Sequence, residues 1–239
     1  MEQSPTAYST IFWHFTGAPK FKENARINRP DDMLKSEKIK RTKTDQEAIK
    51  ILKKILADQK LLATSQEKIM GNIKTKSFCC VCDLPLKDLK VHSQYYGNVA
   101  LGFSSEQIYK NFNPVLYINY EKLELVSEIC INHNKFDWNK IKNREIELDT
   151  IINTRSSLKT QLSSEQFKNY IKLTDFNEAT EKTFYREKEW RCLEDFNFKK
   201  ADVSAVIVPQ NFISPIEKYL NQKKFRNISI ISWEIIEKS

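Results

Sequence analysis

Three short segments of this 239-residue sequence hold residue types that enzymes use, and the first is His14-Phe-Thr16 at the end of an apolar run. Residues two apart in a strand share a face, so His14 and Thr16 would point to the same side. The pair could then donate and accept hydrogen bonds with a ligand in one cleft. The alternative is a partly buried histidine and threonine that hold a loop in place, and the residue types alone favour that alternative.

The second segment is Tyr95-Tyr96-Gly97, which leads into an apolar run at 99–103 and the pair Ser104-Ser105. An aromatic side chain beside a strand usually belongs to the core, but it can also stack on a planar ring such as nicotinamide or adenine. The two serines fit a helix N-cap better than a nucleophile, because no His–Asp partner pattern accompanies them.

The third segment, YREKEWR at 185–191, would place Glu187, Glu189 and Arg191 on one face of a strand. Two neighbouring carboxylates repel each other unless cations or a ligand compensate them. A carboxylate there could stabilise an oxocarbenium-like centre while a glycosidic bond breaks. A surface strand whose charges are neutralised by Arg191 and nearby lysines is the simpler interpretation, and composition alone favours it.

The cysteines and histidines do not predict a metal site. Cys79, Cys80 and Cys82 would alternate between the faces of a strand, and Cys130–His133 is a single close pair where zinc usually takes two. Buried, unreactive thiols are the better interpretation. The sequence contains neither GxGxxG nor GxxxxGK[ST], which disfavours dinucleotide binding of the Rossmann type and P-loop phosphate chemistry.

The elements that must position these segments follow from local patterns. The capping box Thr44-Asp-Gln-Glu47 predicts a helix that runs to about residue 62. Strands are predicted at 9–16, 77–82, 99–103, 115–118, 187–195, 205–208 and 228–236, and helices at 86–95, 104–112, 214–222 and from 163, the last with Phe167, Tyr170 and Ile171 as its apolar face.

This interleaving predicts a single α+β domain over 1–239, with a mixed, mostly antiparallel sheet and flanking helices. A loop excursion is expected at 17–44, and a helix-rich insertion at about 120–182.

Charge and cysteine usage indicate the surroundings of the protein. The net charge is +8, and residues 1–76 hold 16 Lys and Arg against 9 Asp and Glu. A basic surface attracts nucleic acid or an acidic partner, although a lysine-rich genome would give the same composition. No apolar run approaches the roughly 18 residues that span a bilayer, and no signal peptide is evident. Crowded thiols suit a reducing compartment, so we expect a cytoplasmic protein that does not associate with membranes.

Residues 78–119 resemble the central block of the AbiGi-type abortive-infection family. That resemblance rests on Asp83-Leu-Pro-Leu86, His92-Ser93 with Tyr96-Gly97, Gly102-Phe103-Ser104, and Asn113-Pro-Val115 with Tyr117, and the H-F-T and E-W-R segments also fit. Proteins of this family are described as the antitoxin-like half of a two-gene system. The resemblance therefore implies phage defence and a protein partner from the same system.

A weaker resemblance is to ADP-ribosyltransferases of the DarT kind, which begin with H-x-T on a first strand and carry a glutamate on a late strand. It implies that Glu189 is the catalytic carboxylate, with Glu187 as its alternate. The residues that it assigns to NAD are His14, Thr16, Tyr96 and Ser104, with Tyr96 stacking on the nicotinamide. This sequence departs from that family because about 27 residues separate H-x-T from the next helix.

Two functions therefore remain open. One is an ADP-ribosyltransferase-like protein that modifies nucleic acid or protein, in which His14, Tyr96 and Glu189 meet in one pocket. The other is a non-catalytic, antitoxin-like subunit that binds a toxin or nucleic acid, in which Glu187 and Glu189 are ion-paired and no cleft reaches them.

Overall fold

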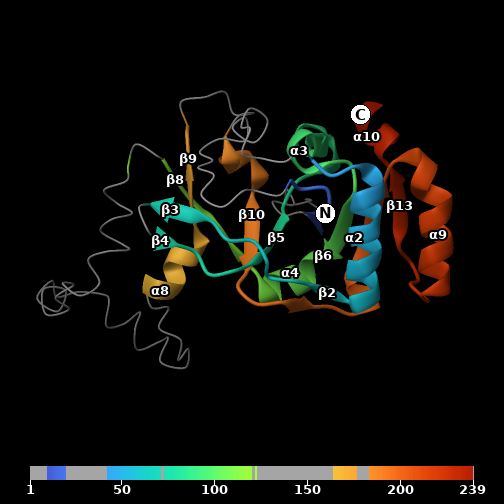
Figure 1. The fold of residues 1–239 in the computed structure, drawn as a ribbon, viewed down its shortest axis with the longest axis horizontal. Coiled ribbons are helices and arrows are strands. Elements are labelled where there is room, and N and C mark those ends of the chain that lie inside the picture. The colour runs from blue at the N-terminus through green and yellow to red at the C-terminus, as the bar shows by residue number, and fades with distance from the viewer. Residues whose placement is uncertain are drawn as a thin grey trace, which may run out of the picture.

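A seven-stranded sheet forms the centre of the protein (Figure 1). The computed structural model describes residues 10–19, 42–70, 73–119, 122, 164–176 and 183–238. The strand order is β13 (Ser229–Ser232), β12 (Val203–Val208), β6 (Ala100–Ser104), β1 (Ile11–Phe15), β5 (Cys79–Cys82), β10 (Glu189–Cys192) and β7 (Asn113–Pro114). Only the β12–β13 pair of this sheet is parallel, so the prediction of an α+β fold with a mostly antiparallel sheet is confirmed.

Shorter elements surround this sheet. Three two-stranded ladders join β11 (Phe196–Asn197) to β2 (Lys60–Leu61), β3 (Lys68–Met70) to β4 (Ile73–Lys74), and β8 (Leu116–Asn119) in parallel to β9 (Ile171–Thr174). The described helices are α2 (Asp45–Asp58), α3 (Leu89–Tyr96), α4 (Ser105–Asn111), α8 (Ser164–Phe167), α9 (Ile213–Gln222) and α10 (Trp233–Lys238). Five 3-10 turns accompany them: η1 (Leu86–Asp88), η4 (Lys168–Tyr170), η6 (Phe184–Glu187), η7 (Lys200–Asp202) and η8 (Gln210–Phe212).

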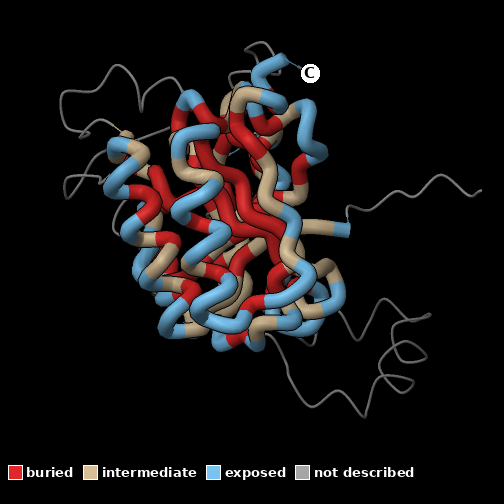
Figure 2. The backbone as a smooth tube through the Cα atoms, turned by 90° about the vertical axis from the view of Figure 1, so that its right-hand side faces the viewer, coloured by how far each residue is buried: buried red, intermediate tan, exposed pale blue. Residues whose placement is uncertain are grey.

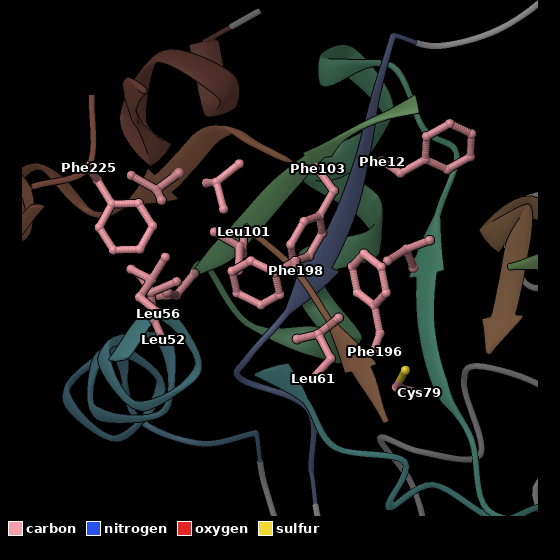
Figure 3. Packing of buried hydrophobic residues seen from close by; sticks show 14 of the residues in the cluster. Phe12, Leu52, Leu56, Leu61, Cys79, Leu101, Phe103, Phe196, Phe198 and Phe225 are labelled. Atoms are coloured by element: carbon pink, nitrogen blue, oxygen red, sulfur yellow. The ribbon is translucent and has the colours of Figure 1, made fainter. Parts of the chain in front are cut away.

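Each face of the sheet packs against its own helices, and the central strands are buried (Figure 2). On one face, Phe12 and Leu101 belong to the same core cluster as Leu52 and Leu56 of α2, and α9 contributes Ile216 to it. Figure 3 shows this cluster, including four phenylalanines from β6 and the C-terminal third. On the other face the core is smaller and consists of Trp13, Phe15, Cys82, Leu84, Leu89, Ala100, Ala205, Ile207, Trp233 and Ile236. Alternate residues of β1 therefore enter two different cores, as the period of two requires.

The predicted capping box starts α2. The Glu47 amide donates to Thr44 Oγ1 at 3.3 Å, and the Thr44 amide donates to Glu47 Oε2 at 2.9 Å. We expect Thr44→Ala to lower the free energy of unfolding by about 1 kcal/mol, because one N-terminal amide loses its acceptor. Urea denaturation measures this change. The control is Thr44→Ser, which keeps the hydroxyl, and an equal loss in both variants would contradict the capping role.

Two glycines hold α3 against the end of β1. Gly97, the C-cap residue of α3, has a φ of +81°, a conformation that side chains rarely adopt. A Cβ on Gly17 would lie 2.6 Å from the carbonyl oxygen of Tyr96, so only glycine lets the two segments approach so closely. This contact fixes the position of Tyr96 at the sheet.

Four predicted boundaries differ from the structure. The helix that starts at Asp45 ends at Asp58 rather than near residue 62, because Gln59 has left-handed backbone angles. The strand predicted at 187–195 begins at Glu189, because Lys188, at a φ of 42°, ends the 3-10 turn that holds Glu187. The run at 228–236 is not one strand, since its second half is α10.

The predicted helix from residue 163 is also shorter than expected. Among the residues described there, Ser164–Phe167 is helical, and Ile171 belongs to strand β9 instead of a helical face. In the predicted loop excursion, 17–19 and 42–44 are irregular, whereas 20–41 lies outside the described residues. Most of the predicted insertion at 120–182 also lies outside them.

Candidate functional site

The buried amine of Lys172 lies among three carboxylates. Its Nζ is 2.8 Å from an oxygen of Glu187, 2.8 Å from an oxygen of Glu189 and 3.2 Å from an oxygen of Glu67. The Lys172 side chain is only 8% exposed, and those of Glu187 and Glu189 are buried as well. Lys172 comes from β9, whereas Glu189 comes from β10 of the central sheet. One cation therefore joins two layers of the fold.

Arg191 completes this ion-pair network from the same face of β10. Its Nε donates to Glu189 Oε1 at 2.7 Å, its Nη2 donates to Glu189 Oε2 at 3.1 Å, and Nη2 also pairs with Glu67. Its Nη1 donates to the carbonyl oxygen of Asn169 at 3.0 Å, and the guanidinium lies 4.1 Å from the centre of the Phe78 ring. A fully buried arginine is tolerated because its donors have acceptors.

The network separates the pKa values of its two buried glutamates. Burial alone would raise the pKa of Glu189, but the charges of Arg191 and Lys172 outweigh burial and lower it to about 2. Burial raises the pKa of Glu187, and Lys172 offsets only part of that effect. The pKa of Lys172 itself is raised well above its usual value, because the attraction of Glu187 and Glu189 exceeds the effect of burial. Glu189 is thus a fixed anion at neutral pH, without the proton that a general acid would donate.

Tyr96 connects α3 to this network. Its hydroxyl donates to Glu187 Oε1, and its ring is stacked on His92 with a centroid distance of 4.3 Å. Burial, followed by the charge of Glu187, raises the pKa of the Tyr96 phenol well above its usual value. The phenol therefore stays protonated and acts as a hydrogen-bond donor.

A pocket of about 20 Å³ lies beside Glu187, between α3 and η6. Its lining includes His92, Thr183 and Arg186. Among the residues that the structure describes, neither Thr183 Oγ1 nor Arg186 Nη1 has a hydrogen-bond partner, although both atoms are buried. A space of this size fits one or two water molecules, which could satisfy such groups, and it does not fit a dinucleotide.

His92 makes the stability of this region sensitive to acid. Burial, together with the charge of Lys172, lowers the pKa of His92 to about 3. An unfolded chain binds a proton at His92 below about pH 6.5 while the folded chain does not, so stability is lost as the pH falls from 6.5 toward 3. The ring is partly exposed, so we expect a loss of only about 1 to 2 kcal/mol between pH 7 and pH 5.

His92→Phe should remove most of that loss, since phenylalanine keeps a stacking ring without a titrating group. Urea denaturation at both pH values measures it. An equally steep pH dependence in this variant would assign the acid sensitivity to another group.

The structure brings together three of the six residues predicted for the site. Tyr96, Glu187 and Glu189 meet at the ion-pair network described above. His14 and Thr16 lie on the opposite face of the sheet, because His14 is paired with Leu101 of the core beneath α2.

The other three residues have separate contacts. Thr16 Oγ1 donates to the carbonyl oxygen of Ala48 at 3.0 Å, and His14 Nδ1 lies 2.8 Å from the carbonyl oxygen of Cys80. These contacts join the end of β1 to α2 and to the neighbouring strand β5. Ser104 is the N-cap residue of α4 at the far end of β6.

The sequence analysis missed Lys172, Glu67 and Asn169, all of which contact Glu189 or Arg191. Lys172 lies in Ile-Lys-Leu-Thr, whose alternation of apolar and polar residues is typical of a strand and could have indicated β9. No local pattern indicates that Glu67, over 100 residues away from Arg191 in the sequence, would reach the same point.

Two further properties concern the described residues alone. Within them, no group of three His, Cys, Asp or Glu side chains is arranged to hold a metal ion, and Cys130–His133 lies outside them. None of their helices combines the length and apolar character needed to cross a bilayer.

Comparison with models of known protein families gives one match. Residues 49–234 match the family described as "Putative abortive phage resistance protein AbiGi, antitoxin". The match runs from within α2 to the start of α10 and includes every member of the ion-pair network. No curated protein and no solved structure matches the chain.

Proposed function

Because the chain belongs to the AbiGi family of abortive phage-resistance proteins, we propose that it is a non-catalytic antitoxin subunit that binds and restrains a protein partner from the same defence system. The family match supports the role in phage defence, and the family description supports the antitoxin role. The absence of catalysis and the protein partner are inferences from the geometry of the site.

The observation that carries the proposal is that Glu187 and Glu189 already have partners for all of their carboxylate oxygens. Both oxygens of each carboxylate accept a hydrogen bond. Glu187 accepts from Tyr96 and Lys172. Glu189 accepts from Lys172 and Arg191. A catalytic carboxylate must exchange such contacts for a substrate, at the expense of a buried lysine or arginine left without a counter-charge. An arrangement of this kind is typical of a structural joint between layers.

An exposed aromatic cluster beside this joint has the composition of a protein-binding surface. Tyr185 is 52% exposed and its ring centre lies 5.4 Å from that of Tyr117 and 5.6 Å from that of Phe176. Phe176 is also exposed. Exposed apolar residues that gather in this way mark interaction sites, and tyrosine is enriched among the residues that dominate binding energy.

The test is binding of the partner encoded with this chain, with Tyr185→Ala as the variant. We expect the wild-type chain to suppress the toxicity of the partner on co-expression and to co-purify with it. Tyr185→Ala should weaken the affinity at least about tenfold. The matched control is Ile235→Ala on α10, where an apolar residue that is 65% exposed lies away from the cluster. Suppression of toxicity without any complex would contradict the proposal.

ADP-ribosyl transfer from NAD is the second candidate, and the hydrogen bond between Tyr96 and Glu187 favours it, because it joins two of the implied site residues. Nicotinamide release by the wild-type chain and by Glu189→Gln, with DNA, RNA and cell extract as acceptors, tests this candidate. Release that disappears in the variant would replace the binding proposal with an enzymatic one. No release, together with no NAD binding by calorimetry, would leave the antitoxin proposal standing.

The excess of basic residues at 1–76 indicates nucleic acid as a further kind of partner. Binding that weakens steeply with salt would support it.

A further inference from the structure

Two cysteines stand directly opposite each other where β5 meets β10. Cys192 is the register partner of Cys79 in this antiparallel ladder. The Cys79 thiol donates to the carbonyl oxygen of Glu194 at 3.6 Å, two residues beyond Cys192. Directly opposed residues have Cα atoms about 4.5 to 5.5 Å apart, which falls inside the range of about 4.4 to 6.8 Å found for disulfides. The two thiols are therefore placed for a bond across the ladder.

The pair also lies where the backbone can adjust. A disulfide draws the two Cβ atoms to about 3.8 Å, closer than an undistorted ladder holds them. Cys79 is the first residue of β5 and Cys192 is the last residue of β10, so only the ends of the two strands need to move.

The two thiols differ in reactivity. The Cys79 side chain beside it lowers the pKa of Cys192 to about 7, so a large part of Cys192 is thiolate at neutral pH. The neighbouring Cys192, followed by burial, raises the pKa of Cys79 well above its usual value. Cys192 is partly exposed, whereas Cys79 is buried in the hydrophobic core cluster that also contains Phe196 (Figure 3). A thiolate is the form that reacts with oxidants, so Cys192 has both the chemistry and the access.

We propose that Cys79 and Cys192 form a peroxide-responsive dithiol that closes to a disulfide between β5 and β10. In the first step the Cys192 thiolate attacks one oxygen of hydrogen peroxide, and the oxygen–oxygen bond breaks to give a sulfenic acid and hydroxide, which is protonated to water. In the second step the sulfur of Cys79 attacks that of Cys192, and the departing hydroxide leaves as water with the proton of Cys79. Two thiols and one peroxide thus give one disulfide and two water molecules.

The neighbouring cysteines provide a contrast within the same strand. Cys80 is paired with Arg191 and Cys82 with Glu189, so neither faces a cysteine across the ladder. Burial raises the pKa of both thiols above the usual value. They should stay reduced while the proposed pair reacts.

The experiment treats the folded, full-length chain with hydrogen peroxide in a Cys130→Ser background, which removes the cysteine outside the described residues. We expect a loss of the mass of two hydrogen atoms, reversal by reductant, and a disulfide-linked peptide pair containing Cys79 and Cys192. Cys192→Ser should abolish the reaction, and Cys80→Ser should leave it unchanged. Urea unfolding before treatment identifies any variant that has lost its fold.

Three results would overturn the proposal. The first is a peroxide-treated chain that keeps both thiols. The second is a disulfide that joins another cysteine pair. The third is a reaction that stops at sulfinic acid on Cys192, since Cys79 would then not reach the sulfur of Cys192. None of these results bears on the antitoxin proposal, because the reaction is measured without a partner.

Discussion

Lys172→Met should lower the free energy of unfolding by about 3 to 5 kcal/mol, a large fraction of the stability of a domain this size. Methionine fills a similar volume, but it removes the cation that separates Glu187 from Glu189. Both carboxylates then remain buried. Glu189 keeps Arg191 as its counter-charge, whereas Glu187 keeps only the hydrogen bond from the Tyr96 hydroxyl. Urea denaturation at pH 7 measures the loss directly.

The stability deficit of Lys172→Met should also depend on pH. Protonation of His92 removes stability as the pH falls, whereas protonation of Glu187 should make this deficit smaller. Without Lys172, the already raised pKa of Glu187 rises further, so this carboxylate takes up a proton more readily in the folded chain. The deficit relative to wild type should therefore narrow as the pH falls from 7 to 5. Adding Glu187→Gln to Lys172→Met should recover part of the stability for the same reason.

An exposed lysine provides the matched control. Lys54 pairs with Asp58 at 2.7 Å on the surface of α2, with 70% of its side chain exposed. Lys54→Met should change the free energy of unfolding by no more than about 0.5 kcal/mol. Equal unfolding midpoints for Lys172→Met and wild type would mean that the network does not stabilise the fold.

Arg191→Met is the second substitution with a large expected effect, again about 3 to 5 kcal/mol. It removes the bidentate partner of Glu189, the donor to the Asn169 carbonyl oxygen and the cation over Phe78. Because Arg191 is fully buried, water cannot replace these contacts.

Arg191→Lys separates charge from geometry. An ammonium keeps the positive charge but cannot donate to Glu189 and Asn169 through a planar fork. We expect this variant to lose about 2 to 3 kcal/mol, most of the effect of methionine, and to show it as a lower urea midpoint. Full rescue by lysine would show that charge alone matters at this position.

The strands and helices with strong local signals could be predicted from the sequence. The capping box at Thr44 and the glycine at position 97 act within one helical turn. The residue types alone were therefore sufficient to predict where these helices begin or end. The apolar run of β1 was likewise enough to predict a strand that ends near His14 and Thr16.

The candidate site was harder to predict because its contacts are non-local. The repulsion between Glu187 and Glu189 did indicate that cations must lie close by, and Arg191 was named as one of them. The main cation, Lys172, lies on β9, which pairs in parallel with β8. The spacing of residues within 163–176 can indicate a strand, but it does not show with which strand it pairs. Nor does the sequence show that the left-handed Lys188 turns Glu187 out of the strand while its carboxylate still reaches Lys172.

The faces of the sheet could not be assigned from β1 alone. Alternation predicts that His14 and Thr16 share a side, but it does not say which side carries Glu189. That depends on the register between β1 and β5, where Trp13 rather than His14 is opposite Cys82. A shift of one residue would have exchanged the faces.

The central place of β1 also sets an order of events while the chain is being made. β1 lies between β6 and β5, yet it precedes both in the chain, and its register partners follow 69 to 93 residues later. Contacts between residues so distant in sequence slow folding, because loop closure must precede the gain from pairing. Until those partners emerge, an apolar strand with two open edges remains exposed, and that interval is when the nascent protein is most exposed to aggregation and in most need of a chaperone.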